Sequence, residues 1–161
     1  MGLLDAKEYD PRPRQRAIRI ILLAVVAIIV GLVSYFLFRY QPEKNVVNAF
    51  LDAIQTKDFE KAYGIYQADR DWKQHPQKYG TYTYNQFYLD WGPQGDYGII
   101  TTHAVECAVE PKPAGFHPAS GVIVVVRINN RTDRTESLWV EKKSKVISLP
   151  PEKVLCPGSN T

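Results

Sequence analysis

Aromatic side chains and one histidine are the residues of this sequence that could build a small-molecule site. The chain of 161 residues contains ten Tyr, three Trp and six Phe, and buried tyrosine hydroxyls can donate hydrogen bonds to an oxyanion that forms during catalysis. His103 lies on the drier face of a segment of alternating polarity, where an imidazole could act as an acid or a base. The pocket-lining residues that we predict are Tyr63, Tyr66, Tyr84, Tyr88, Trp91 and His103.

The same side chains have an alternative role in packing. Aromatic rings fill a core, or anchor a protein at a membrane interface, without any ligand. A lone histidine on a dry face is commonly a structural residue held by hydrogen bonds. We therefore assign no catalytic residue, and the sequence leaves open whether the aromatic set lines a pocket or fills a core.

The acidic residues and histidines are poorly arranged for catalysis or metal binding. Glu106 and Glu110 share the wetter face of a predicted strand, so we expect both carboxylates to face water. His75, His103 and His117 lack the i, i+4 spacing and the cysteine pairs that are typical of metal sites. No Gly-rich phosphate loop, nucleophile elbow or Cys–His signature is present in the sequence. We expect no metal, no cofactor and no enzymatic activity.

The chain has two cysteines, Cys107 and Cys156. A bond between them would tie a C-terminal tail to the first predicted strand, and closing a loop of about 50 residues would contribute roughly 4 kcal/mol in the chain-entropy model. The alternative is a buried thiol at Cys107 and an unpaired thiol at Cys156. We favour the bond on condition that this part of the chain lies outside the cytoplasm.

One apolar run predicts a transmembrane helix. Residues 20–38 read IILLAVVAIIVGLVSYFLF, without a charge, and a helix of this length nearly spans a hydrocarbon core of about 30 Å. The run has no polar face at helical spacing, which argues against a buried core helix. A cleaved signal peptide normally has about 7–15 apolar residues before small ones, whereas this run ends in bulky side chains. We predict a retained helix over residues 20–39 behind a basic cytoplasmic tail, residues 1–19.

The distribution of charge predicts the orientation. Six Lys or Arg and three Asp or Glu lie within residues 1–39, and the remaining fourteen of each sign lie within residues 40–161. The positive-inside rule then places the N-terminus in the cytoplasm and exports the C-terminal domain to the periplasm or the cell exterior, from a single-pass anchor in the inner (plasma) membrane. A neutral body argues against nucleic-acid binding. The expected partners are the membrane and either another envelope protein or a second copy of the chain.

Three helices are predicted at the start of the exported domain. The apolar residues between Val46 and Ile54 form one stripe after Pro42, which suits a first helical turn. Asp58 can cap a second helix, and residues 67–81 are polar and predict a loop. Thr83 and Gln86 form a capping-box pattern that begins a third helix.

After Gly98 the period of the sequence changes to two, which predicts strands. Alternation over residues 99–110 places Cys107 on the same face as His103 and Val105. Residues 121–129 are rich in β-branched residues and predict a central strand. Two further strands and a tail follow, at residues 136–142, 145–149 and 151–161. Helices followed by an antiparallel meander define an α+β domain, residues 43–150, with the helices on one sheet face.

Residues 46–66, VVNAFLDAIQTKDFEKAYGIY, resemble the opening helix pair of the cystatin-like roll in the nuclear-transport-factor-2-like superfamily. The resemblance covers residues 43–150 and implies a curved antiparallel sheet of about four strands, wrapped around the helices as a cone with a pocket at its open end. Members of this superfamily include enzymes such as ketosteroid isomerase, ligand carriers and non-catalytic assembly modules, some of them membrane-anchored in bacteria. The fold alone does not choose between these functions.

The function that we expect from the sequence is that of a membrane-anchored envelope protein whose exported domain is a non-catalytic interaction or assembly module. One alternative is a carrier or sensor of a small apolar ligand in the aromatic-lined pocket. The other is a pocket enzyme of the isomerase type. An acid or His103 in a closed apolar cavity would favour the enzyme, whereas a filled cone would argue against both alternatives.

Overall fold

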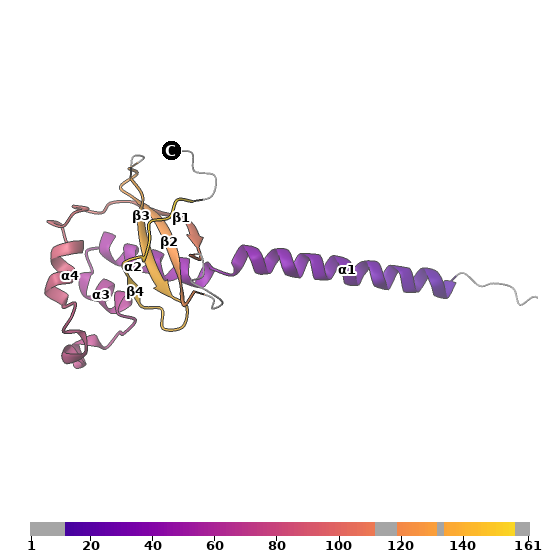
Figure 1. The fold of residues 1–161 in the computed structure, drawn as a ribbon, viewed down its shortest axis with the longest axis horizontal. Coiled ribbons are helices and arrows are strands. Elements are labelled where there is room, and N and C mark those ends of the chain that lie inside the picture. Colours follow the sequence, from indigo (N-terminus) through magenta and orange to yellow (C-terminus); the bar gives the residue numbers. More distant parts are fainter. Residues whose placement is uncertain (1–11, 112–118, 132–133, 157–161) are drawn as a thin grey trace, which may run out of the picture. The chain divides into compact units, whose positions relative to one another are not determined.

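The computed structural model describes residues 12–111, 119–131 and 134–156, and the chain divides into two compact units, residues 1–39 and 40–161 (Figure 1). The described part of the first unit forms the helix α1 (Arg12–Phe38). Its described side chains from Gln15 to Phe38 are exposed along the whole helix. This helix near the N-terminus is long and apolar enough to span a membrane. Residues 1–11 of the predicted basic tail lie outside the described residues.

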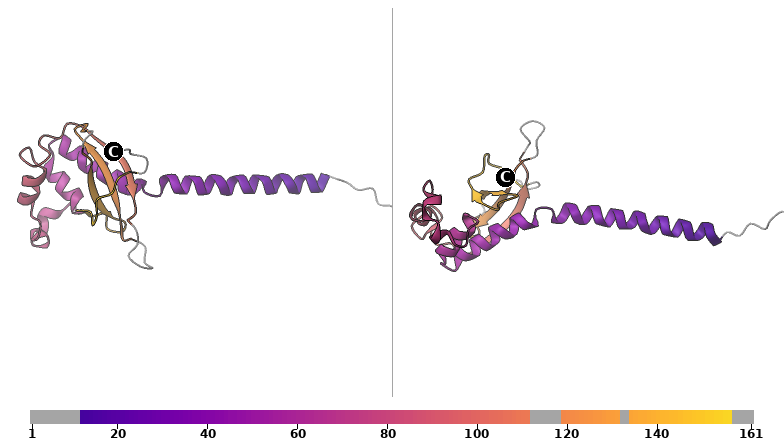
Figure 2. Two further views of the ribbon diagram at one scale, coloured as in Figure 1. Left: turned by 45° about the horizontal axis from the view of Figure 1, so that its top comes forward. Right: turned by 90° about the horizontal axis from the view of Figure 1, so that it is seen from below.

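The second unit, which we call the body, is an α+β domain, as the sequence predicts. Three α-helices, α2 (Gln41–Gln55), α3 (Phe59–Tyr66) and α4 (Tyr84–Trp91), precede an antiparallel sheet. The strands pair in chain order, β1 (His103–Val109), β2 (Gly121–Ile128), β3 (Glu136–Glu141) and β4 (Ile147–Ser148). The helices gather on one face of this sheet (Figure 2).

Local capping interactions set the bounds of the helices. The Asp58 side chain accepts a hydrogen bond from the backbone N–H of Lys61, at 3.1 Å, and begins α3. Thr83 and Gln86 form the complete capping box at the start of α4. Pro42 lies in the first turn of α2, where its missing N–H removes no helical bond. These three predictions are confirmed.

The segment over residues 67–81 is more ordered than its polar composition predicts. It contains two short 3₁₀ helices, η1 (Trp72–Gln74) and η2 (Pro76–Tyr79). Tyr79 is buried, and its hydroxyl donates a hydrogen bond to the Asp69 carboxylate at 2.5 Å. The Trp72 ring packs edge-on against Tyr63 on α3, with 4.7 Å between ring centroids. These two aromatic side chains hold the segment against the helices, so the loop prediction is wrong here.

The central strand β2 is buried on both faces, as its β-branched sequence predicts. The other predicted strands are present but shorter. Residues 99–102 lie outside β1, and side chains bind the backbone of Thr101. The Asn129 side chain accepts a hydrogen bond from the Thr101 N–H at 2.8 Å, and the Gln55 side chain donates one to the Thr101 carbonyl at 2.6 Å.

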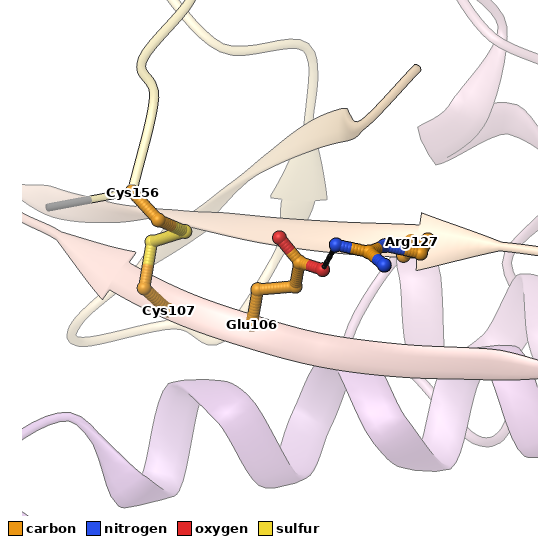
Figure 3. Close-up of a disulfide and its surroundings, with 4 residues drawn as sticks. All are labelled: Glu106, Cys107, Arg127 and Cys156. Atoms are coloured by element: carbon orange, nitrogen blue, oxygen red, sulfur yellow. Dashed lines mark ion pairs between the residues drawn. A yellow bond between two sulfur atoms is a disulfide. The ribbon is translucent and has the colours of Figure 1, made fainter. Parts of the chain in front are cut away.

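A β-bulge in β1 changes which face its later residues occupy. The register with β2 shifts between Val105 and Cys107, so Glu106 has no partner of its own on β2. Val105 and Ala108 pack against the core beneath the helices. Cys107 and Glu106 both project to the opposite face of the sheet (Figure 3). The prediction that Cys107 shares a face with His103 and Val105 is therefore wrong.

Glu106 itself keeps the face that strict alternation predicts, opposite Val105 (Figure 3), but it is only partly exposed there. Its carboxylate forms an ion pair with Arg127 on β2 (Figure 3). Glu110 forms an ion pair with Lys142, at 2.8 Å, and accepts a hydrogen bond from the Tyr40 hydroxyl at 2.9 Å. Both carboxylates are half-buried and paired, because each lies beside a basic side chain of a neighbouring segment, so the expectation that they face water is wrong.

Candidate functional site

Tyr63 lies at the centre of the helix-side core and is 1% exposed. Its ring contacts those of Trp72 and Phe87, and its hydroxyl donates a hydrogen bond to the Tyr82 carbonyl at 2.6 Å. Burial raises the pKa of Tyr63, so the phenol stays protonated and keeps this bond. Tyr63 borders a small cleft of about 210 Å³, but its main role is packing.

Tyr84 and Tyr88 lie on the side of α4 away from the sheet. Tyr84 stacks on Trp72, with 5.2 Å between centroids. Tyr88 packs edge-on against Phe59 at 5.0 Å and remains 44% exposed. With Leu89 they border a shallow depression of about 380 Å³, which is a surface feature more than a pocket.

Tyr66 and Trp91 line a different and deeper feature, a groove of about 610 Å³ that we call the aromatic groove. The end of α3, the end of α4 and the turn after it form one wall, and β3 with the residues around β4 forms the other. Its lining residues are Tyr66, Tyr82, Asp90, Trp91, Asp96, Tyr97, Leu138, Ser148 and Leu149. This is the candidate functional site.

The aromatic groove is held by ring contacts and by hydrogen bonds between side chains. The Trp91 ring stacks on Tyr97 with 4.8 Å between centroids and an interplanar angle of 23°. The Tyr66 and Tyr82 rings are 5.4 Å apart. The Tyr82 hydroxyl donates a hydrogen bond to Asp90 Oδ2 at 2.7 Å. Beneath the groove, Phe50 of α2 supports Trp91 edge-on at 4.9 Å.

Burial and neighbouring carboxylates keep the phenols of the groove neutral. Burial and then the charge of Asp90 raise the pKa of Tyr66 to about 12. Burial and then Glu136 raise the pKa of Tyr97 to about 12. Burial and the hydrogen bond to Asp90 raise the pKa of Tyr82 far above its ordinary value. All three hydroxyls can therefore donate hydrogen bonds, and none supplies negative charge at neutral pH.

His103 lies apart from the aromatic groove. Its Nε2 atom is 3.5 Å from Asp52 Oδ1 on α2, and its side chain is 9% exposed. Its Nδ1 atom is buried without a hydrogen-bond partner. The imidazole is packed between α2 and the start of β1 and lines none of the clefts described here. The structure thus distributes the predicted pocket residues over the core, the α4 surface, the groove and the α2–β1 contact.

Seven groove residues were not among those predicted from the sequence: Tyr82, Asp90, Asp96, Tyr97, Leu138, Ser148 and Leu149. A turn-rich segment, GPQGDYG, returns Asp96 and Tyr97 to the end of α4. Within it, a Cβ on Gly95 would collide with the Asp90 carbonyl, so the turn closes tightly enough to require glycine. The glycines that follow Trp91 at this spacing are the signal in the sequence that could have identified Asp96 and Tyr97 as groove residues.

Another cleft, of about 840 Å³, lies between α3 and η1. Acidic and basic side chains both line this cleft, and Lys73 and Glu60 form an ion pair there at 2.6 Å. Within the part of the chain that the structure describes, no group of three or more His, Cys, Asp or Glu side chains is arranged to hold a metal ion. His117 lies outside the described residues.

On the other face of the sheet, Cys107 and Cys156 form a disulfide with 5.8 Å between their Cα atoms (Figure 3). This is the pair that the sequence favours, and it fastens the C-terminal tail to β1.

Comparisons of the chain with protein-family models, with curated proteins and with solved structures find no match. The fold and the site therefore define an α+β domain that follows an apolar helix, with an aromatic groove on its helical side.

Proposed function

We propose that this protein is a single-pass envelope protein of the inner (plasma) membrane, and that its exported body is a non-catalytic interaction or assembly module. One observation carries the proposal. The aromatic side chains that a deep catalytic pocket would need are packed against one another, with Tyr63 1% and Trp91 6% exposed. A core of this kind is a scaffold that presents surfaces.

The membrane anchor and its orientation are supported by two further observations. The side chains of α1 from Ile20 to Phe38 are exposed, uncharged and almost all apolar, and such exposure costs little free energy only in a lipid environment. Disulfides persist in oxidising compartments, so the Cys107–Cys156 bond supports export of the body. Arg16 and Arg19 precede the apolar run and suit the cytoplasmic side.

The resemblance to the cystatin-like roll is part of this proposal. The α2–α3 helix pair packs on a four-stranded antiparallel meander in chain order, which is the arrangement that the resemblance implies. The aromatic groove lies between the ends of α3 and α4 and the β3–β4 side of the sheet. Assembly modules of that superfamily act through their surfaces, and an anchored module of this kind fits the whole chain.

The surface that we assign to partner binding is the exposed side of α4. Leu89 is 65% and Tyr88 44% exposed on this short helix, and both border the shallow depression described above. Adjacent exposed aromatic and aliphatic side chains are typical of protein–protein contacts. The partner is another envelope protein or a second copy of this chain.

Site-specific photocrosslinking in native membranes tests this assignment. A photoreactive phenylalanine analogue at Leu89 of the full-length chain should give one discrete adduct, while the same analogue at Gln77, an exposed polar position on η2, should give none. An adduct of twice the chain mass identifies a second copy. Equal crosslinking at both positions, or none at either, would contradict the interaction module.

Protease protection tests the orientation independently. In cells whose outer layers have been opened, external protease should degrade the body and leave a fragment that contains α1. A protected body would overturn the N-in orientation without bearing on the α4 surface. The two experiments thus separate the topology from the function.

A further inference from the structure

We propose that the aromatic groove binds a small organic cation with an apolar body. This goes beyond the interaction module, which requires no small ligand. The proposal rests on the shape of the groove, on the chemistry of its walls and on the sign of its charge.

The walls of the groove suit a flat or branched apolar body. Four aromatic rings line it, and Leu138 and Leu149 add aliphatic surface. A volume of about 610 Å³ lies within the common range for small-molecule sites. Two rings are already fixed by the stacking of Trp91 on Tyr97, so a ligand would meet a preformed surface and order few side chains.

The charge of the groove is negative. Asp90 and Asp96 are its charged lining residues, and no Lys, Arg or His is among them. Asp90 Oδ2 accepts the Tyr82 hydroxyl, and Oδ1 has no hydrogen bond from any described residue. That oxygen is available to a cation. An anionic ligand would meet two carboxylates and no basic side chain among the lining residues.

One ring of the groove already attracts a cation. The Arg134 guanidinium lies 5.8 Å from the centroid of the Tyr97 ring, within the distance at which a cation is attracted by an aromatic face. Arg134 also forms an ion pair with Glu136, so its charge is balanced locally. Because the phenols of the groove are neutral, the attraction for a ligand comes from ring faces and from the two carboxylates.

The test uses three soluble probes of similar size that differ in charge: benzyltrimethylammonium, benzyl alcohol and phenylacetate. Binding to the full-length chain in lipid nanodiscs is measured by saturation-transfer NMR and isothermal titration, with empty nanodiscs as the blank. We expect benzyltrimethylammonium to bind at least tenfold more tightly than phenylacetate, about 1.4 kcal/mol, with benzyl alcohol between them. Equal affinities for the three probes, or no binding by the cation at about ten millimolar, would overturn the proposal.

Matched variants locate the binding. Asp96→Asn removes one charge at an exposed side chain, and Asp90→Asn keeps an acceptor for the Tyr82 hydroxyl. Each should weaken the cation about three- to tenfold and leave benzyl alcohol unchanged. Asp71→Asn, at an exposed acid of the wider cleft, should change nothing. If Asp71→Asn weakens binding of the cation as much as Asp96→Asn does, the electrostatic attraction is general and the groove is not the site.

The proposed function has a separate test, photocrosslinking at Leu89, so failure of the binding experiment does not affect it.

Discussion

The two faces of the sheet are buried equally well at β2 but by different means. On the helix side, Val124 and Val126 are fully buried against a core that includes Phe50 and Phe87. On the other side, Ile123 and Val125 are at most 1% exposed, although no helix in the described part of the body covers that face (Figure 2). There the neighbours in register are Trp139 on β3 and Cys107 on β1.

This difference shows how each face depends on its surroundings. The helix side relies on close packing of apolar side chains, which needs no particular compartment. The other side relies on a covalent bond between β1 and the tail, and on the partly buried Glu106–Arg127 ion pair beside it. A disulfide is stable only where the redox conditions allow it. The outer face therefore makes the stability of the body depend on an oxidising environment, and the inner face does not.

The largest effect should come from the helix side. Phe50→Ala removes a fully buried ring that contacts Tyr66, Phe87 and Trp91, and the resulting cavity should lower the free energy of unfolding by about 3–5 kcal/mol. Denaturant unfolding of the full chain in detergent, followed by near-ultraviolet circular dichroism, measures it. Leu89→Ala, at an exposed position of α4, should cost less than about 1 kcal/mol. A loss below about 1 kcal/mol for Phe50→Ala would show that the helix side is loosely packed.

Loss of the disulfide should be the largest effect on the outer face. Cys107→Ser with Cys156→Ser should lower the free energy of unfolding by roughly 2–4 kcal/mol, and reductant should do the same to the unmodified chain but not to the variant. Phe50→Ala should cost the same with and without reductant, because its face holds no redox-active group. Ready alkylation of both thiols in the absence of reductant would refute the bond and weaken the case for export.

A smaller effect should come from the contact between β2 and Trp139. A Cβ on Gly121 would collide with the Trp139 ring and lie 2.6 Å from the Val140 carbonyl oxygen, so Gly121→Ala should cost about 1–3 kcal/mol. Gly80→Ala is the matched control. Its Cβ would lie 3.9 Å from the Gln77 carbonyl oxygen, at a φ of −60°, so the substitution should be neutral or slightly stabilising. Equal losses for both variants would mean that β2 and Trp139 are not tightly packed.

The sequence predicts the elements of this fold well where a local signal marks them. Asp58 and the Thr83–Gln86 pair begin two helices through their own side chains, and the β-branched composition of β2 reflects its burial on both faces. The bulge at Glu106 has no such signal, because alternation of polar and apolar residues continues through it. The contacts that accompany the bulge are the Glu106–Arg127 ion pair and the Cys107–Cys156 disulfide, and both depend on segments distant in sequence.

The candidate site is predicted in part for the same reason. Tyr66 and Trp91 end helices whose periodicity is readable, so their types and positions indicate an aromatic wall. Tyr82 and Tyr97 lie in segments without periodicity, and their positions depend on how the turns fold back. His103 has the expected polarity, but its place beside Asp52 depends on how α2 packs on β1. The sequence indicates which side chains are apolar, whereas the tertiary fold determines which of them leave a groove between them.

The smallest expected effect concerns the phenols of the groove and appears only at high pH. Tyr66 and Tyr97 have a pKa of about 12 in the folded body, against about 10 in an unfolded chain. Since the folded state holds these protons longer, their stabilising contribution is complete below pH 10 and is lost as the pH rises from about 10 to 12. Absorbance of the phenolate form should show a late phase that the chain unfolded in denaturant lacks, and Tyr66→Phe should reduce it.

The late phase also distinguishes the two causes of the raised pKa of Tyr66. Burial is the larger cause and the charge of Asp90 the smaller. Asp90→Asn should therefore lower the pKa of Tyr66 only slightly, while the Cys107→Ser, Cys156→Ser variant should leave it unchanged, because the disulfide lies on the other face. A late phase that disappears on reduction would mean that the two faces unfold together at high pH, and that the groove owes its burial to the disulfide as well as to the aromatic packing beneath it.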